Sequence, residues 1–335
     1  LPVKKYLFLF YLADPAKVPE RRGKGLGSGF GALEHNHCSF YFLPDNRKGK
    51  ELKKALQDVC THEFLHILTP LNVHSKEIDD FNFRSPRMSK HLWMYEGVTE
   101  YFSLLALLQT GEITEKEFIK EIRLKMIRSE KFDSFSMTEM SKNVVETENQ
   151  KRYLSVYSRG ALLAMMLDIL IIDKTEGKSS LKDVMLQLKQ KYGPSKPFDD
   201  DNLLTEIAGM THPDIKDFFD RHINGSETPS YYSYLKLIGF GYEHSFQKQV
   251  YYFGRHGIKL DTDKNEFSFI QVEQNYLGVR DDDILLSINE EEVSEDNIDR
   301  IYNEYFSENE SDKEINVVIK RYGEKITLTA RPRPA

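Results

Sequence analysis

Two stretches of the chain combine an apolar helical pattern with ionisable side chains at helical spacing. The first covers roughly residues 50–68 and surrounds its histidines with apolar residues, namely Val59, Phe64, Leu65, Ile67 and Leu68. The second, Leu92–Phe102, is also apolar and carries two glutamates four residues apart. Ionisable groups on buried helices need partners. The pattern therefore predicts buried carboxylates that face a buried pair of histidines.

The spacing of these ionisable groups is typical of a zinc site. A helix places His62 and His66, four residues apart, on one face, where both imidazoles can bind one metal ion. Glu63 leans toward the same cleft and can take a proton from water. Glu96 would be the third ligand, and Glu100 would hold a ligand histidine through its other ring nitrogen. Three protein ligands and an open position predict one catalytic Zn²⁺ per chain; the alternative is an exposed helix with two unrelated histidines.

The remaining pattern predicts an α+β protein with two domains. Residues 1–45 would form the β-rich start of a catalytic domain at 1–230, and strand-like runs from about Ser226 onward indicate a second domain at 231–335. The expected strands are 3–12, Phe30–Leu43, 249–253, 267–272, 284–288, 315–320 and 325–330. The expected helices are Glu115–Glu130, Ala161–Ile172, Ser180–Tyr192, Asp201–Ala208, Pro213–Ile223 and Asp296–Tyr305, with irregular segments at Thr69–His91 and Lys131–Gln150.

The strand expected at Phe30–Leu43 has candidate chemistry of its own. A glycine-rich run, Gly23 to Gly31, precedes it but lacks the Gly-Lys-Ser/Thr ending of a phosphate-binding loop. Alternation along the strand would place Glu34 on one face, with His35 and His37 on the other. A metal site at the two histidines is a minor alternative, and Glu34 taken alone could be a solvated charge at a sheet edge.

Composition excludes some classes of function. The 335 residues are 40% hydrophobic and carry a net charge of −7, which argues against nucleic-acid binding. No apolar run reaches the ~18 residues of a membrane span, because Asp168 interrupts the longest run. Two cysteines, Cys38 and Cys60, form no disulfide framework and leave the compartment open. The chain begins at Leu1, and we expect a missing N-terminal part; a signal peptide there would place the protein in the periplasm or cell envelope.

Five segments carry a resemblance to one family and appear in that family's order. They are Gly31-Ala-Leu-Glu-His35, His62-Glu-Phe-Leu-His66, Trp93–Tyr101, Tyr157–Leu163 and Ala208–Arg221. They cover most of residues 30–225, where the chain resembles the glycyl aminopeptidase family of gluzincin zinc metallopeptidases. The resemblance implies a thermolysin-like, mostly helical catalytic domain followed by a PDZ domain, and a β-rich N-terminal domain that is missing here.

The second domain carries its own part of this resemblance. Leu277–Asn289 is similar to the turn and strand of a PDZ domain, although Asp281 and Asp282 replace its usual small residues. Gly257–Leu260 would stand where the peptide-carboxylate loop of a PDZ domain lies. The resemblance therefore implies a PDZ-like domain whose partner is the C-terminus of a peptide or protein.

The resemblance also assigns residues around the zinc site. Glu34 matches a glutamate that binds the free α-amine of a substrate, with the backbone of Gly31 and Ala32 beside the peptide. Tyr157 matches a tyrosine that stabilises the oxyanion, although a tyrosine just ahead of a buried helix is usually a core residue. These matches imply a zinc-dependent aminopeptidase that releases N-terminal residues from peptides, with Gly or Ala preferred.

Two other functions remain open at this point. A PDZ-guided zinc endopeptidase would cleave N-blocked peptides, whereas a catalytically silent scaffold of the same fold would lack metal or turnover. The complete ligand set and Glu63 favour an enzyme over a scaffold. Glu34 favours an aminopeptidase over an endopeptidase.

Overall fold

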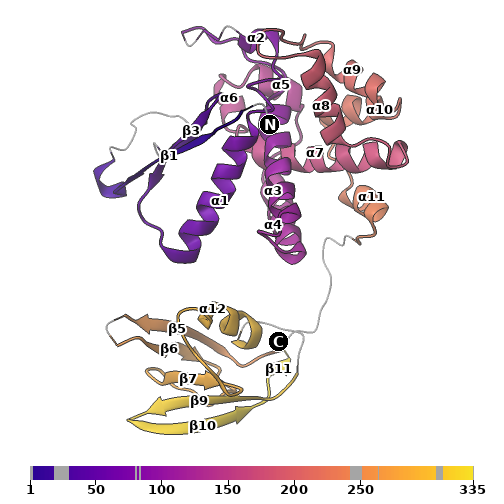
Figure 1. Cartoon of the computed structure of the whole chain (residues 1–335). Coiled ribbons are helices and arrows are strands. Elements are labelled where there is room, and N and C mark those ends of the chain that lie inside the picture. The colour runs from indigo at the N-terminus through magenta and orange to yellow at the C-terminus, as the bar shows by residue number, and fades with distance from the viewer. Residues whose placement is uncertain are drawn as a thin grey trace. The chain divides into compact units, whose positions relative to one another are not determined.

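The apolar helix α7 (Ser155–Lys174) organises the first part of the molecule. Nearly every side of α7 is buried, including Val156, Leu163 and Ile171. Helices α4 (Glu115–Ser129) and α3 (Thr99–Gln109) pack against it (Figure 1). By length and composition α7 could cross a membrane, but 78% of the apolar window is buried within the structure, as in the core helix of a folded domain.

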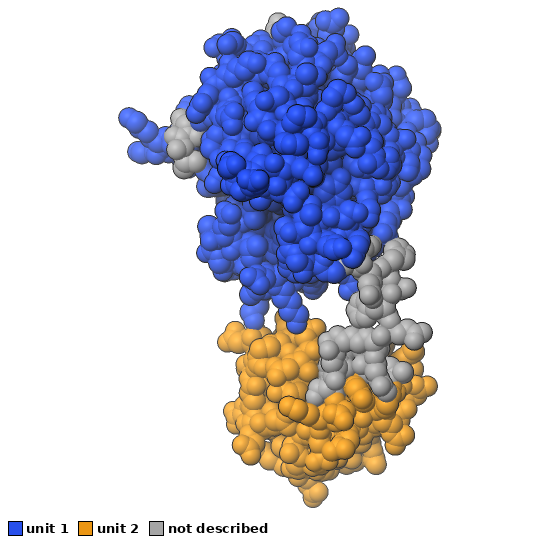
Figure 2. Space-filling model, turned by 90° about the vertical axis from the view of Figure 1, so that its right-hand side faces the viewer, with its two compact units in different colours: residues 1–242 blue, residues 243–335 orange. Residues whose placement is uncertain are grey.

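The computed structural model divides into unit 1, Leu1–Tyr242, and unit 2, Glu243–Ala335 (Figure 2). This division lies beyond the boundary expected after residue 230, because α11 (Tyr231–Leu235) packs against α7 and belongs to the core of unit 1. The structure describes residues 3–18, 30–79, 81–82, 84–241, 251–262, 264–306 and 312–334. The glycine-rich run before Gly31 lies outside the described residues.

Three described strands form a sheet in unit 1, in the order β1 (Leu7–Ala13), β3 (Cys38–Pro44) and β2 (Gly31–Glu34). β1 is parallel to β3, and β2 is antiparallel to it. The single strand expected over this region is wrong, because the N–H of His35 donates to the carbonyl of Cys38 at 2.8 Å and closes a turn. His35 and His37 lie in this exposed turn. The strand alternation that would place both side chains on one face for a metal ion is therefore absent.

Helices make up most of unit 1. The two apolar stretches form α1 (Gly49–Leu65) and a π-helix, η2 (Trp93–Val98), that continues into α3. The loop expected at Lys131–Gln150 is wrong, because Ser136 caps a helix by accepting a hydrogen bond from the N–H of Glu139. The other helices are η1 (Pro15–Lys17), α2 (Lys76–Asp79), α5 (Met137–Lys142), α6 (Thr147–Gln150), α8 (Leu181–Lys191), α9 (Leu203–Met210), α10 (Ile215–Phe218), η3 (Phe219–Ile223) and η4 (Lys236–Ile238).

The elements η2 and α7 touch through their backbones at two glycines. A Cβ added at Gly97 would lie 2.5 Å from the carbonyl carbon of Gly160, closer than real side chains approach. Only glycine fits at this crossing without moving one of the two elements. This backbone contact holds together the two segments that carry Glu96 and Tyr157. Glu96 directly precedes Gly97, and Tyr157 lies one turn before Gly160.

The described residues of unit 2 form antiparallel strands and one helical segment, so the mixed helix-and-sheet class expected from the sequence is confirmed. Its main sheet has the strand order β10 (Glu324–Ala330), β9 (Ile315–Arg321), β7 (Ile284–Ile288), β6 (Glu266–Glu273) and β5 (Arg255–Asp261), and β8 (Glu291–Glu292) pairs with β7. The helical segment, α12 (Ile298–Ile301) and η5 (Tyr302–Phe306), adds Ile301 and Phe306 to the core. The two other described strands of unit 2, β4 (Tyr251–Tyr252) and β11 (Arg333–Pro334), pair with each other.

Strand β5 is not among the predicted elements. It contains Gly257–Leu260, which were expected in a carboxylate-binding loop and lie instead in an extended strand. The cause is antiparallel pairing with β6, in which Ile258 stands opposite Phe269. β5 ends the strand order of this sheet, and the hydroxyl of Tyr302 donates to the carbonyl of His256 on β5 at 3.2 Å.

Candidate metal centre and active site

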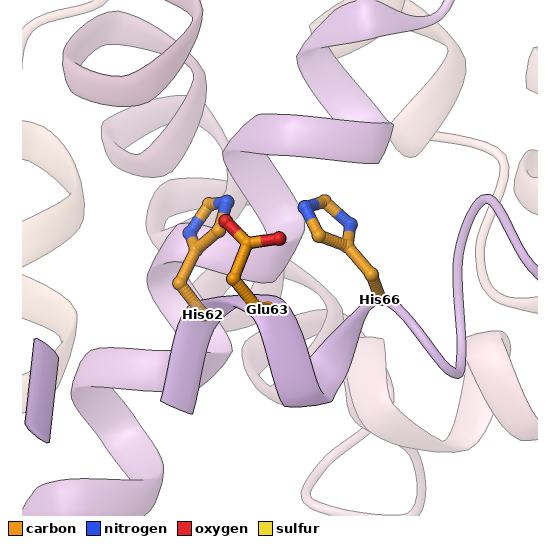
Figure 3. Close-up of side chains that lie close together, drawn as sticks. All are labelled: His62, Glu63 and His66. Atoms are coloured by element: carbon orange, nitrogen blue, oxygen red, sulfur yellow. The ribbon is translucent and has the colours of Figure 1, made fainter. Parts of the chain in front are cut away.

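Helix α1 brings two histidines and a glutamate together at its buried end. His62 and Glu63 lie in the last turn of α1, and His66 follows in helical conformation. All three side chains are buried, and their donor atoms lie within 4.8 Å of one another. Figure 3 shows the two imidazoles projecting the same way, with the Glu63 carboxylate between them. Phe64 packs edge-to-face on Tyr6 at 5.0 Å, which anchors this end of α1 beside the start of β1.

Glu96 on η2 joins the two histidines. Its Oε2 atom lies 3.2 Å from Nε2 of His62 and 3.6 Å from Nε2 of His66. Two ligands of one tetrahedral zinc ion lie about 3.3–3.6 Å apart when each bond is about 2.0–2.2 Å long, so these atoms fit one shared ion. Burial would raise the pKa of Glu96, but the hydrogen bond with His62 and the nearby His66 lower it. π-Helical turns such as η2 occur frequently at functional sites.

The second nitrogen of each imidazole is held by another group. Nδ1 of His66 lies 2.9 Å from the carbonyl oxygen of Thr69 and donates its proton there. Nδ1 of His62 lies 2.8 Å from Oε2 of Glu100, which accepts that proton. Both Nε2 atoms are therefore directed toward Glu96. Burial would lower the pKa of His62, but hydrogen bonds to Glu100 and Glu96 raise it to about 10, so the space between the two carboxylates favours a positive charge.

Glu100 connects His62 to a buried lysine. Its Oε1 atom pairs with Nζ of Lys125 on α4, a residue that is only 5% exposed. Burial would raise the pKa of Glu100, but the hydrogen bond with His62 and the charge of Lys125 lower it to about 2. The sequence pattern predicts Glu100 at this place but does not indicate Lys125. Its position along the helix is the feature that could have indicated its burial, because Lys125 lies in the apolar stripe of α4 with Ile122 and Met126.

Glu63 has a buried oxygen without a partner. In the described part of the chain, Oε2 of Glu63 makes no hydrogen bond. Burial raises the pKa of Glu63 to about 7, with Glu34 and Glu96 adding to the rise and His62 opposing it. Because native proteins rarely leave a buried polar atom unsatisfied, this oxygen indicates that the site is made to receive a further group. A carboxylate with this pKa can both take and give a proton near neutral pH.

Tyr157 lies within the first turn of α7, not ahead of a helix as the sequence suggests. Its ring is 5.7 Å from the ring of His62, and its hydroxyl is 3.2 Å from that of Tyr153. Burial and the charge of Glu96 raise the pKa of Tyr157, so its hydroxyl stays protonated and can donate a hydrogen bond. Tyr153 is a second hydroxyl at the site that the sequence analysis does not single out.

Glu34 stands at the end of β2, an end strand of the sheet of unit 1. Its charge contributes to the raised pKa of Glu63, which places the two carboxylates within electrostatic reach of each other. Gly31 and Ala32 precede Glu34 on the same strand. Among the described strands β2 pairs with β3 alone, so its other edge can accept an extended peptide.

A cavity of about 700 Å³ opens beside these groups. His62, Glu63, Glu100 and Tyr157 line it, and residues of α1, α3 and α4 form its walls. Its size lies in the range of sites that bind small molecules. The cavity therefore gives a substrate access to His62, Glu63 and Tyr157, whereas His66, Glu96 and Glu34 are not among the residues that line it.

One stretch of the chain matches a known protein family. Residues 55–163 match the model of a family described as M61 glycyl aminopeptidase, so the resemblance seen in the sequence is confirmed. The matched stretch includes the two histidines, Glu63, Glu96 and Tyr157, whereas Glu34 lies before it. No match to a curated protein was found.

Among solved structures, the chain is similar to an aminopeptidase N family protein from Idiomarina loihiensis, with 22% identity and a TM-score of 0.60. At this identity the likeness concerns the fold alone. The match covers 100% of this chain, which spans 60% of the length of that protein. A weaker similarity is to the HtrA-type protease AlgW with tripeptide, with 20% identity and a TM-score of 0.22 over 27% of this chain and 33% of that chain. Another is to the PDZ domain of EpsC from Vibrio cholerae, with 13% identity and a TM-score of 0.18 over 24% of this chain and 95% of that chain. Both scores are too low to assign the fold of unit 2, and its PDZ-like character stays a prediction.

Proposed function

We propose that unit 1 is a zinc-dependent aminopeptidase with a thermolysin-like catalytic fold, which releases N-terminal residues from peptides and prefers Gly or Ala. The observation that carries the proposal is the convergence of three donor atoms beside a buried carboxylate oxygen without a partner. The donors are Nε2 of His62, Nε2 of His66 and Oε2 of Glu96, and the oxygen belongs to Glu63. The family match over residues 55–163 supports a peptidase.

His62, His66 and Glu96 would hold one Zn²⁺, since two imidazoles and one carboxylate are a donor set that catalytic zinc uses. When bound, the ion supplies Lewis-acid chemistry, which polarises a carbonyl group and makes water a better nucleophile at neutral pH. Glu100 and the carbonyl of Thr69 would keep the two rings in place through their Nδ1 atoms.

Glu63 and Tyr157 would carry out the proton transfer and charge stabilisation. The unpartnered Oε2 of Glu63 takes a proton from the attacking water, and the carboxylic acid then gives it to the leaving amine. The hydroxyl of Tyr157 donates a hydrogen bond to the oxyanion as the scissile carbonyl becomes tetrahedral. Both side chains line the same cavity, so one bound peptide can reach them together.

Glu34 would bind the free amino group of the substrate through a charge-assisted hydrogen bond. The peptide would lie along the open edge of β2 beside the backbone of Gly31 and Ala32. An anchored amino group places the first peptide bond at Glu63, so that one residue is released at a time. In unit 2, a PDZ-like domain would add a site for the C-terminus of a peptide or protein, which could pair with an end strand of the sheet, β5 or β10.

The experiment is hydrolysis of a panel of aminoacyl amides beside their N-acetylated forms, with metal analysis of the protein. We expect stoichiometric zinc, turnover of the free-amine substrates with glycyl and alanyl amides fastest, and little cleavage of the blocked forms. A chelator should abolish turnover, and added Zn²⁺ should restore it. Equal cleavage of blocked and free substrates would favour an endopeptidase guided by unit 2, whereas absence of metal or turnover would favour a silent scaffold.

A further inference from the structure

Lys125 occupies a position where the pattern of α4 predicts an apolar residue. One stripe of α4 is buried against α7 and α3 and contains Ile122, Met126 and Ser129. Lys125 belongs to this stripe and is only 5% exposed, whereas Lys120 on the same helix is exposed. Burying an ammonium group costs free energy unless a partner compensates it. The role of Lys125 must therefore be found in the group it contacts.

That group is Glu100 on α3. Nζ of Lys125 contacts Oε1 of Glu100, and Oε2 of the same carboxylate lies 2.8 Å from Nδ1 of His62. On the other side of the ring, Nε2 of His62 lies 3.2 Å from Glu96. One carboxylate thus connects a buried cation on α4 to an imidazole on α1.

We propose that Lys125 is a positioning residue of the metal centre, which holds Glu100 so that His62 presents Nε2 toward Glu96. The inference rests on the proposed zinc site. A glutamate side chain has several rotatable bonds and two equivalent oxygens. With Lys125 bound to Oε1, the carboxylate is fixed at both oxygens, and the ring of His62 is fixed with it.

Lys125 also balances charge at the site. Glu96 and Glu100 lie four residues apart, flank the same imidazole and repel each other at this spacing. Within the described residues, Lys125 makes an ion pair with Glu100 and with no other carboxylate. Its charge therefore compensates Glu100 and leaves the charge of Glu96 for a metal ion.

Replacement by methionine separates this role from a purely structural one, because methionine resembles the lysine stem in length and shape but lacks the charge. If Lys125 only fills space, Lys125→Met keeps the metal affinity. If Lys125 positions Glu100, the zinc affinity falls roughly tenfold, at the lower end of what groups that orient metal ligands contribute. Lys125→Arg keeps the charge and should retain most of the affinity.

The experiment measures the Zn²⁺ dissociation constant of the full chain by competition with a chromophoric chelator. The variants are Lys125→Met, Lys125→Arg and the exposed control Lys120→Met. A double-mutant cycle adds Glu100→Gln and the variant that combines Glu100→Gln with Lys125→Met. We expect Lys125→Met to lose nothing further in the Glu100→Gln background, because Lys125 acts through Glu100. Circular dichroism checks folding. If Lys125→Met does not fold, Lys125→Gln is used in its place.

A second readout needs no metal. In zinc-free protein the Nδ1 proton of His62, held by Glu100, should give a low-field NMR signal, assigned by its absence from His62→Ala. We expect Lys125→Met to broaden or lose this signal and Lys120→Met to keep it. An unchanged signal in Lys125→Met, or an equal loss of zinc affinity with and without Glu100, overturns the inference. A signal lost in Lys125→Met in a protein that binds no zinc would support the positioning of His62 and overturn the zinc proposal.

Discussion

At the scale of single residues, the site is defined by a charge that the protein does not balance by itself. Glu63, Glu96 and Glu100 are three carboxylates around His62, and Lys125 is the cation that pairs with one of them. A metal-bound imidazole is neutral, so His62, whose raised pKa keeps it protonated in the metal-free protein, would give up its proton when a metal binds. The three ionised carboxylates and Lys125 would then leave two negative charges, which a divalent cation would balance. The unpartnered oxygen of Glu63 lies in the same place. Charge and hydrogen bonding therefore agree on where a metal ion would bind.

Removal of a ligand should separate metal binding from chemistry. We expect His62→Ala and Glu96→Ala to lose zinc and activity together, because two remaining ligands bind zinc far more weakly than three. Glu63→Gln should keep zinc and lose about 10²–10⁴-fold in turnover, the usual contribution of a general base. Metal analysis and hydrolysis rates check both results, with His37→Ala in the exposed turn as the control. Stoichiometric zinc in His62→Ala would contradict the ligand assignment.

Glu34 decides between an aminopeptidase and an endopeptidase. A substrate amino group is largely protonated near neutral pH, with a reference pKa of about 7.7–8.0. Removing one partner of such a charged pair costs about 2–5 kcal/mol, or roughly thirty- to several-thousand-fold. We expect Glu34→Ala to keep zinc and lose this factor in kcat/KM for free-amine substrates, whereas Glu115→Ala, exposed on α4, changes nothing. Wild-type rates in Glu34→Ala would exclude the aminopeptidase.

At the scale of elements, the crossing of η2 and α7 places Glu96 near Tyr157. A methyl group at position 97 would lie 2.5 Å from backbone atoms of Gly160. We expect Gly97→Ala to cost about 1–3 kcal/mol, as overpacking does, and to weaken zinc binding because η2 must move. Gly209 lies inside α9 with nothing within 4 Å of its added Cβ, so Gly209→Ala should be neutral or stabilise by roughly 0.5–1 kcal/mol. Thermal unfolding and zinc titration of both variants check this. If Gly97→Ala and Gly209→Ala had the same stability and zinc affinity, the close contact between η2 and α7 would not be what positions Glu96.

In unit 2, a buried ion pair connects β9 to the turn before β7. Asp283 accepts hydrogen bonds from Arg321 at 2.8 and 2.7 Å and from the N–H of Arg280. Burial would raise the pKa of Asp283, but these partners lower it. Since its folded pKa lies below the unfolded value of about 3.9, the carboxylate stabilises unit 2 above that pH, and this stability is lost as the pH falls through the folded pKa.

We therefore expect Asp283→Asn to lower the stability of unit 2 by about 1–3 kcal/mol at neutral pH. The same variant should flatten the loss of stability in acid. Both effects are measured by the free energy of chemical unfolding between pH 3 and pH 7, a range that includes the unfolded-state pKa of about 3.9. Asp282→Asn is the control, because Asp282 is exposed. An unchanged pH profile in Asp283→Asn would show that this pair does not contribute to stability.

The parts of the fold that sequence reasoning predicts are those where burial forces a pattern. The helices α1 and α7 are long and apolar, and the charges of Glu96 and Glu100 stand out against an apolar background. The strand pattern continued through His35 because a short turn leaves no gap in the alternation. Helices α5 and α6 are too short and polar to show a repeat. Lys125 was missed because a single lysine on a helix is ordinarily exposed, and its burial depends on Glu100, 25 residues away.

At the scale of the whole molecule, every residue proposed for metal binding, catalysis or recognition of the substrate amine comes from unit 1. Strand β2 provides Glu34, and the helices α1, η2, α3, α4 and α7 provide the rest. The hydrophobic cores of unit 1 and unit 2 are separate. Unit 2 therefore provides none of the chemistry proposed here, and its part would be in choosing longer substrates.

A chain that ends at Tyr242 should therefore fold, bind zinc and hydrolyse small aminoacyl amides about as well as the full chain. The division between Tyr242 and Glu243 keeps α11 with the core of unit 1, where Tyr231 and Leu235 are buried. A chain that ends at residue 230 lacks these two side chains and should be less stable, since a large buried apolar side chain contributes about 2–5 kcal/mol. Thermal unfolding, metal analysis and hydrolysis rates of the two truncations beside the full chain measure the difference. If the folded 1–242 protein bound no zinc or lost turnover, unit 2 would be needed for the catalytic machinery, and the assignment of the whole site to unit 1 would be wrong.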